Sequence, residues 1–121
     1  DIDFTVAGYF TAYFARILLD KKHFDGVDVL KVEVPRHATP ETEWEISKLS
    51  RLRYYVPTPS NRTSWDEPGP IGYTHDNNLP HEKEGTDVYV LRHKKKVAVT
   101  PIDLDMTARV DFGKFEKHLR G

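Results

Sequence analysis

The sequence predicts an α/β fold, and three observations carry that prediction. An amphipathic helical pattern over residues 4–22 runs directly into an alternating strand pattern over 27–34. A capped helical turn at 87–93 is followed by a second alternating strand at 97–100. A helix that leads straight into a strand is half of an α/β unit. A chain of 121 residues then forms one domain, or part of one.

The first helix is predicted from apolar residues that recur at steps of three and four: Val6, Phe10, Tyr13, Phe14, Ile17 and Leu18. This stripe is typical of core packing. Asp3 or Thr5 is expected to cap the start of the helix, and Asp25-Gly26 to end it.

The first strand has two distinct faces. One face is apolar and the other mixed, with Leu30, Val32 and Val34 on one side and Val29, Lys31 and Glu33 on the other. Pro35 ends the strand. A strand usually precedes such a helix, and none does so here. We therefore expect the chain to be the C-terminal portion of a longer protein.

The middle of the chain, 36–84, is predicted to hold a β-arm and loops. Residues 44–55 fit a strand or a helix, and their aromatic residues favour a strand. Residues 56–70 contain four prolines and form either the tip of a β-arm or a mobile loop, after which 71–74 resumes a strand. In the polar stretch that follows, His75, Asp76 and His81 allow a metal-site interpretation, although solvated loop histidines are the commoner case.

The last third, 85–121, is predicted to hold a short helix, a strand and a C-terminal tail. Thr86 suits the N-cap position, with Asp87 in the first turn, and Val88 and Leu91 are expected to face inward. Pro101 is expected to end the strand. A terminal helix is predicted over 110–119, with an apolar stripe of Phe112, Phe115 and Leu119.

Bulk composition excludes several classes of function. The net charge is about −1, which gives no general attraction to a nucleic acid polymer or a membrane. The only basic run, Lys94-Lys95-Lys96, is typical of a solvated hairpin or edge strand. The chain has no cysteine, which excludes a disulfide framework or a thiolate site and fits a reducing compartment such as the cytoplasm.

One short motif resembles a catalytic one. Asp103, Asp105 and Thr107 form an Asp-x-Asp-x-Thr sequence, similar to the signature of haloacid-dehalogenase-type phosphatases, in which the first Asp attacks phosphorus. In that family the motif opens the catalytic domain, and further catalytic residues follow far downstream. Only 14 residues follow Thr107 in this sequence, so the context argues against a catalytic role. The structural alternative is an ion pair between Asp105 and Arg109 across one helical turn, which makes them hinge residues at the start of the tail.

Several motifs together resemble the C-terminal signature of the SurE survival proteins. These are GTDV at 85–88, VAVTPI at 97–102 and DMTA at 105–108. Upstream, 29–35 resembles the core strand of that family, and 44–55 the strand with its T-R-x-x-R-Y-Y pattern. Order and spacing agree over almost the whole chain.

The resemblance implies a nucleoside 5′/3′-monophosphate phosphohydrolase that depends on a divalent metal, Mg²⁺ or Mn²⁺. It implies a Rossmann-type three-layer α/β sandwich, in which this chain is the C-terminal part with β-arms and a terminal helix. Homodimers or homotetramers are implied as well, formed by exchange of those elements. Apart from the resemblance, Arg51 and Arg53 are candidates for contact with phosphate or with a partner's carboxylate, although a solvated strand face is the commoner case for such residues.

The sequence also departs from the family pattern. In the family, the metal ligands come from an adjacent Asp pair, a Ser and the Asn of an S-G-x-N motif. This sequence contains neither an adjacent Asp pair nor an S-G-x-N motif. No catalytic or metal-binding residue is therefore assigned in this chain. Lys31 and Glu33 stand where Asn is common, Ala98 where Ser is common, and Arg109 where His is common.

Overall fold

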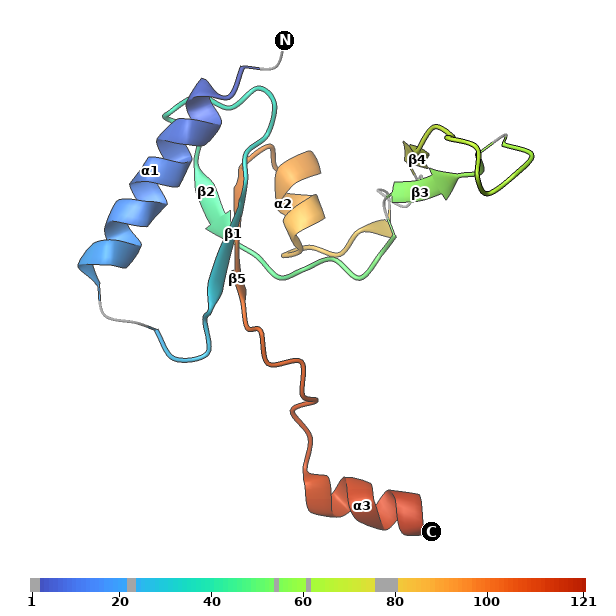
Figure 1. Ribbon diagram of the computed structural model, residues 1–121. Coiled ribbons are helices and arrows are strands. Elements are labelled where there is room, and N and C mark those ends of the chain that lie inside the picture. Colours follow the sequence, from blue (N-terminus) through green and yellow to red (C-terminus); the bar gives the residue numbers. More distant parts are fainter. Residues whose placement is uncertain (1–2, 22–23, 54, 61, 76–80) are drawn as a thin grey trace.

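The computed structural model describes residues 3–21, 24–53, 55–60, 62–75 and 81–121 (Figure 1). The elements follow in the order α1 (Thr5–Asp20), β1 (Val29–Glu33), β2 (Trp44–Ile46), β3 (Tyr55–Thr58), β4 (Gly72–His75), α2 (Asp87–Arg92), β5 (Val97–Ile102) and α3 (Phe112–Arg120). The predicted α/β class is confirmed. Among the described helices, none has the length and apolar character that crossing a bilayer requires.

The central sheet has the strand order β1-β5-β2. The middle strand, β5, runs antiparallel to β1 and parallel to β2. Val99 pairs with Val32 on one side and with Ile46 on the other. Paired residues share a face of the sheet, so this register assigns the side chains of all three strands to two faces.

The first face packs against α1 and holds the hydrophobic core. Phe10 and Phe14 of α1 are buried against Val97 and Val99, with Val6, Leu30, Val32 and Val34 around them. The ring of Phe14 meets that of Trp44 edge-on at 5.4 Å. The predicted stripe is thus confirmed at its centre, whereas Leu18 near the helix end is 54% exposed. Asp3 accepts the Thr5 N–H at 2.8 Å, but the N-cap residue is Phe4, which has no side-chain cap, so the predicted capping by Asp3 or Thr5 was wrong.

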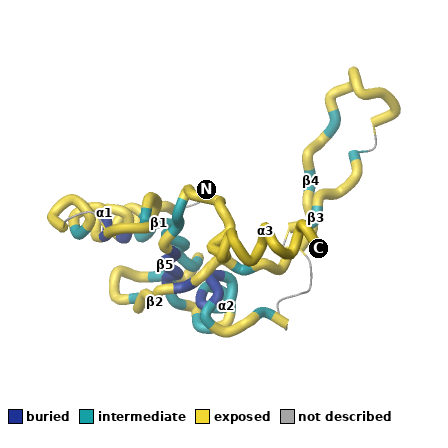
Figure 2. The backbone as a smooth tube through the Cα atoms, turned by 90° about the horizontal axis from the view of Figure 1, so that it is seen from below, coloured by how far each residue is buried: buried dark blue, intermediate teal, exposed yellow. Residues whose placement is uncertain are grey.

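The second face packs against α2, so the sheet lies between two helices (Figure 1). This face carries Ala98 and Thr100 of β5, which are buried together with Val90 of α2. The Ser47 and Thr100 hydroxyls lie 2.8 Å apart in a buried hydrogen bond. Figure 2 shows the buried residues gathered on α1, α2 and β5, which is the arrangement of a three-layer sandwich.

The predicted end of β5 was wrong. β5 continues through Pro101 to Ile102, where the prediction ended it at Pro101. Pro101 pairs with Leu30 of β1, and β2 extends only as far as Val99. Because β5 has one neighbour at this point, a residue without an N–H is tolerated there.

In α2, the buried hydrophobic residue is Val90, whereas Val88 and Leu91 are half-buried. Asp87, which was predicted only to lie in the first turn, is buried together with Val90, three positions further along the same helical face.

β3 and β4 form a separate two-stranded antiparallel ribbon, which we call the arm, and it extends away from the sheet (Figure 1). Tyr55 pairs with His75, and Pro57 with Tyr73. Of the two alternatives for this stretch, the structure shows the β-arm. Of the strand predicted over 44–55, the structure shows only its two ends, as β2 and as the start of β3, whereas 47–53 lie outside the strands. In the loop that joins β3 and β4, the Arg62 guanidinium lies 4.5 Å from the Trp65 ring centre.

The C-terminal helix α3 begins at Phe112, two residues later than predicted. Asp111 caps it by accepting the Lys114 N–H at 3.0 Å. Each of its residues is exposed (Figure 2), and it stands well away from the sheet at the end of an extended segment (Figure 1). The protein therefore has two projecting elements, the arm and α3.

Candidate functional site

The most connected polar region lies where α2 begins, at the Gly85-Thr86-Asp87 motif. Gly85 adopts a left-handed backbone with φ of 81°, which turns the chain into the helix. Thr86 is the N-cap and accepts the Tyr89 N–H at 3.3 Å, as predicted. Asp87 is only 4% exposed and therefore needs partners for its charge.

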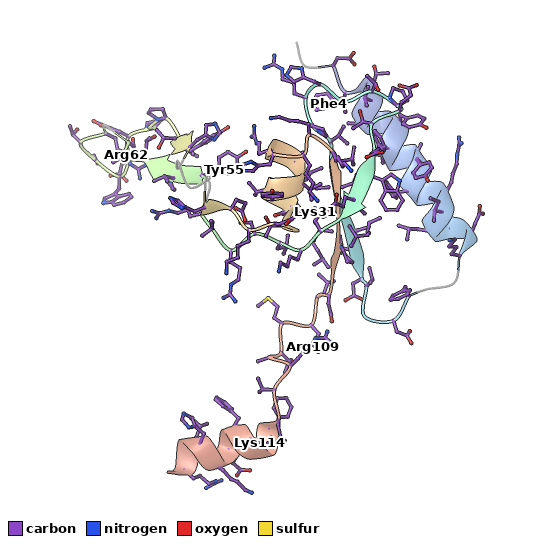
Figure 3. The ribbon with its side chains drawn as sticks, turned by 180° about the vertical axis from the view of Figure 1, so that it is seen from behind. Phe4, Lys31, Tyr55, Arg62, Arg109 and Lys114 are labelled. Atoms are coloured by element: carbon purple, nitrogen blue, oxygen red, sulfur yellow. The ribbon has the colours of Figure 1, made fainter. Side chains whose placement is uncertain are left out.

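A lysine from the sheet supplies the main partner. Lys31 Nζ of β1 donates to Asp87 Oδ2 at 2.8 Å. Figure 3 shows Lys31 at the sheet, beside α2. The same ammonium lies 2.8 Å from Glu33 Oε2, as a charge contact without the alignment of a hydrogen bond. Lys31 and Glu33 thus place two charges on the face of β1 that α2 covers.

The electrostatics of this pair favour both charged forms. Burial alone raises the pKa of Asp87, but hydrogen bonds from Lys31 and from the N–H groups of Ser50 and Val88 outweigh it and hold the pKa below 3.8. Burial alone lowers the pKa of Lys31, and the carboxylates of Asp87 and Glu33 outweigh it and raise the pKa above 10.5. The contact is therefore an ion pair at neutral pH.

The same carboxylate holds the segment that leads into the arm. Ser50 donates its N–H to Asp87 Oδ1 at 2.8 Å and its hydroxyl to Glu82 Oε2 at 2.8 Å. Glu82 Oε1 also accepts the Thr86 hydroxyl at 2.7 Å. We call Ser50, Glu82, Thr86 and Asp87 the arm anchor. It joins a residue before β3 to residues after β4, and so ties the two segments that flank the arm to the start of α2.

The Asp-x-Asp-x-Thr segment is arranged as successive turns. Asp103 accepts the Asp105 N–H at 2.8 Å, and Asp105 accepts the Thr107 N–H at 2.9 Å. Hydrogen bonds from the side chain and backbone of Thr107 lower the pKa of Asp105 below 3.8. The predicted ion pair of Asp105 with Arg109 was wrong, because Arg109 pairs with Asp103 instead. The segment is not helical here, so positions 105 and 109 do not share a helical face. A hinge role for Asp105 and Arg109 stays a prediction.

The remaining candidates are spread over the surface. Arg51 and Arg53 are exposed in the segment between β2 and the arm, and their contact with phosphate or a partner stays a prediction. The basic run lies at the turn before β5, where Lys94 pairs with Glu45 at 2.7 Å and Lys96 with Glu43 at 2.6 Å. These ion pairs agree with a structural role for that run.

The described residues do not fit a divalent metal site. His75 lies at the end of β4 and His81 before α2, while Asp76 lies outside the described residues. Within the ranges that the structure describes, no three histidine or carboxylate side chains converge as metal ligands require. Asp87 and Glu82, the acidic residues with the most partners, are engaged with Lys31, Ser50 and Thr86.

Sequence reasoning missed the arm anchor and the Lys31–Asp87 pair. Their residues are far apart in the chain, and no local period connects Lys31 to a position 56 residues away. One signal was present: a strand in which Lys31 and Glu33 alternate with three apolar residues has charges on a face that a second layer has to cover.

The fold and the polar site define an α/β/α protein with two projecting elements. Comparison with curated proteins then gives the family. The chain is 43% identical over 122 residues to the 5′-nucleotidase SurE of Thermococcus kodakarensis, covering 98% of this chain and 45% of that protein. It is 42% identical over 121 residues to the 5′-nucleotidase SurE of Thermococcus gammatolerans, covering 99% and 44%. For the 5′-nucleotidase SurE of Methanosarcina mazei, identity is 36% over 106 residues.

Over the length that it spans, the chain belongs to the SurE family. The resemblance seen in the short motifs is thereby confirmed. No family model matches the chain. The chain spans less than half the length of these curated relatives, which agrees with the predicted C-terminal portion.

Proposed function

We propose that the protein containing this chain is a metal-dependent nucleoside 5′/3′-monophosphate phosphohydrolase, to which this chain contributes scaffold and subunit contacts. The observation that carries the proposal is 43% identity, over nearly the whole chain, to a protein named 5′-nucleotidase SurE. Mg²⁺ or Mn²⁺ would supply Lewis-acid chemistry at the phosphate. Its ligands are expected in sequence that this chain does not include.

The structure supports the scaffold role in two ways. Its buried residues build a sheet covered by a helix on each face, which is a rigid support for a neighbouring site. Its buried carboxylate, Asp87, is occupied by Lys31 and Ser50 and so acts in the structure rather than on a ligand.

The two projecting elements support the role in assembly. Phe112, Phe115 and Leu119 of α3 are between 52% and 70% exposed. Apolar residues at helical spacing on an unpacked helix are typical of a surface that another protein covers. We infer that α3 and the Pro-rich part of the arm contact a second copy of the chain in a homodimer or homotetramer. A cytoplasmic location is part of the proposal, since a chain without cysteine suits a reducing compartment.

The test is release of inorganic phosphate from a nucleoside monophosphate with Mn²⁺ or Mg²⁺. We expect activity from the full-length protein and none from the 121-residue chain by itself. The Asp103→Asn substitution, made in the full-length protein, is expected to leave the rate within about twofold, because Asp103 pairs with Arg109 and accepts the Asp105 N–H.

Two rival functions give different results in the same assay. Activity of the isolated chain that is lost in Asp103→Asn would establish a phosphatase using Asp103, Asp105 and Thr107. A full-length protein that releases no phosphate from any nucleotide but still oligomerises would be a non-catalytic association module. The exposed apolar stripe of α3 is the observation that supports an association module as the alternative function.

A further inference from the structure

We propose that α3 of one copy of the chain docks on the arm of a second copy, with the apolar stripe of the helix in a hollow on the arm. This inference rests on the proposed function, which gives both elements to subunit contacts, and it specifies which element meets which. Four observations carry it: the hollow, the unpacked helix, the direction in which the two elements leave the body, and their charges.

The hollow has a volume of about 360 Å³ and is lined by Tyr55, Pro57, Ile71, Gly72 and Tyr73. The centres of the Tyr55 and Tyr73 rings are 4.9 Å apart with an interplanar angle of 89°, so each ring holds the other in place. Both rings remain more than half exposed, and Ile71 is fully exposed. None of the lining residues carries a formal charge. An uncharged, apolar surface of this kind is suited to apolar side chains from another protein element.

α3 presents such side chains. Phe112, Phe115 and Leu119 form a stripe at helical spacing, and no residue of the helix is buried. α3 has only nine residues, and a helix this short is marginally stable in water by itself. It therefore needs a surface that covers the stripe.

The arm of the same chain does not cover it. In Figure 1 the arm projects to the side of the body, whereas α3 lies beyond the end of β5. Asp28 accepts the Leu104 N–H at 2.8 Å and so holds the start of the segment that leads to α3. In a pair of copies related by a twofold axis, each α3 can instead meet the arm of the other copy. The contact then occurs twice and the pair is closed.

Charge and shape favour this pairing over the two symmetric ones. α3 carries Lys114, Lys117 and Arg120 against the single carboxylate of Glu116, so two α3 helices side by side would bring like charges together.

Two arms face to face would place hollow against hollow and leave a void, which protein interfaces avoid. The loop between β3 and β4 carries the exposed carboxylates of Asp66 and Glu67 against the one guanidinium of Arg62 among its described residues. Only the pairing of α3 with the arm matches a stripe to a hollow and a basic element to an acidic one.

The experiment maps the contact by cross-linking, which the absence of cysteine from these 121 residues makes specific. Two differently tagged copies of the full-length protein are co-expressed, one with Ile71→Cys and the other with Leu119→Cys, and treated with a short thiol cross-linker. Both side chains are exposed, and neither substitution removes a ring of the contact. We expect a covalent product that carries both tags and is absent from the parent protein.

Lys117→Cys is the matched control for Leu119→Cys. Lys117 lies two positions after Phe115, a rotation of about 200°, so it is on the far side of α3 from the stripe. Paired with Ile71→Cys, it should give far less of the mixed product. Equal product from Lys117→Cys, or products that carry only one kind of tag, would overturn the proposal.

Sedimentation of the full-length protein gives a second measurement. Tyr73→Ala and Phe115→Ala should each raise the dissociation constant of the dimer by about tenfold or more, the loss of an aromatic anchor. Because the two substitutions remove the same contact, the double variant should be weakened by about the factor of one single variant. Losses that multiply would assign the two rings to different contacts and contradict the proposal.

Cross-linking separates this inference from the proposed function, because it does not depend on catalysis. A full-length protein that releases no phosphate but gives the mixed product would refute the phosphohydrolase and support the docking of α3 on the arm. A protein that releases phosphate but does not give the mixed product would support the phosphohydrolase and overturn the docking.

Discussion

Lys31 Nζ lies 2.8 Å from Asp87 Oδ2, and this contact joins β1 to α2 across 56 positions of the chain. Asp87 also accepts the Ser50 N–H at 2.8 Å. A strand, a helix and the segment leading to the arm therefore meet at one buried carboxylate. Its removal should affect the fold and the orientation of the arm together.

The first prediction concerns Asp87→Ala. The substitution leaves the Lys31 ammonium with Glu33 alone and leaves the Ser50 N–H without its acceptor. We expect a loss of about 2 kcal/mol in the free energy of unfolding, toward the low end for a broken ion pair. The Lys31 side chain is 35% exposed, so water regains part of its charge. Urea unfolding measures the loss.

Glu116→Ala is the control for that measurement. Glu116 forms an exposed pair with Arg120 at 2.7 Å, and such pairs contribute less than about 1 kcal/mol. If the two variants lost the same stability, Asp87 would not be the junction that the structure shows.

The second prediction is the pH dependence of this effect. The pKa of Asp87 is below 3.8 in the folded protein, so its contribution is present at higher pH and is lost as pH falls through the folded pKa. The pKa of Lys31 is above 10.5, so its contribution is present below that value and is lost as pH rises through the folded pKa. The stability difference between the parent and Asp87→Ala should be constant from about pH 5 to 9 and shrink below about pH 4. A difference that grew on acidification would contradict the ion pair.

The fold was predictable wherever a local pattern decided the outcome. Thr86 caps α2 because a side-chain oxygen at that position reaches the Tyr89 N–H, whatever packs nearby. Phe10 and Phe14 are buried because their spacing places both on the sheet side of α1.

The fold was not predictable where contacts between segments far apart in the sequence decided the local structure. Pro101 lies within β5 because β2 ends beside Val99, and no local rule gives the length of a neighbouring strand. Val90 is more deeply buried than Val88 and Leu91 because Asp87 faces the sheet to meet Lys31, and Val90 lies on the same helical face as Asp87. The ion pair of Arg109 was mispredicted for a related reason. The sequence allowed a helix here, but the segment forms successive turns, and these bring Arg109 to Asp103.

The third prediction tests the exposed stripe of α3. Phe115 is 52% exposed in this structure, so Phe115→Asp should cost the isolated fold little. If α3 contacts a second copy, the charge would be buried without a partner, and sedimentation of the full-length protein should shift to a smaller species. Lys117→Ala, on the same helix, should leave the assembly unchanged. A parent that is already a monomer at high concentration would remove the basis for a subunit contact.

The fourth prediction is that alanine changes the free energy of unfolding in opposite directions at two glycines. Gly8 lies inside α1, and a Cβ there would meet no atom within 4 Å, so Gly8→Ala should raise the free energy of unfolding by about 0.5–1 kcal/mol. Gly85 has equal space around a Cβ but a φ of 81°, so Gly85→Ala should lower it by about 1–2 kcal/mol.

The two sites differ in backbone conformation and hardly at all in packing, so urea midpoints at constant m-value isolate the cost of the left-handed turn. That turn also presents the Gly85 carbonyl to the Lys48 N–H at 3.1 Å, next to the arm anchor. If Gly85→Ala is destabilising, hydrogen exchange at Lys48 and Ser50 should accelerate in the same variant, because the turn positions Thr86 and Asp87. A stabilising Gly85→Ala would mean that the chain enters α2 without a left-handed turn, and the arm anchor would then need a different geometry.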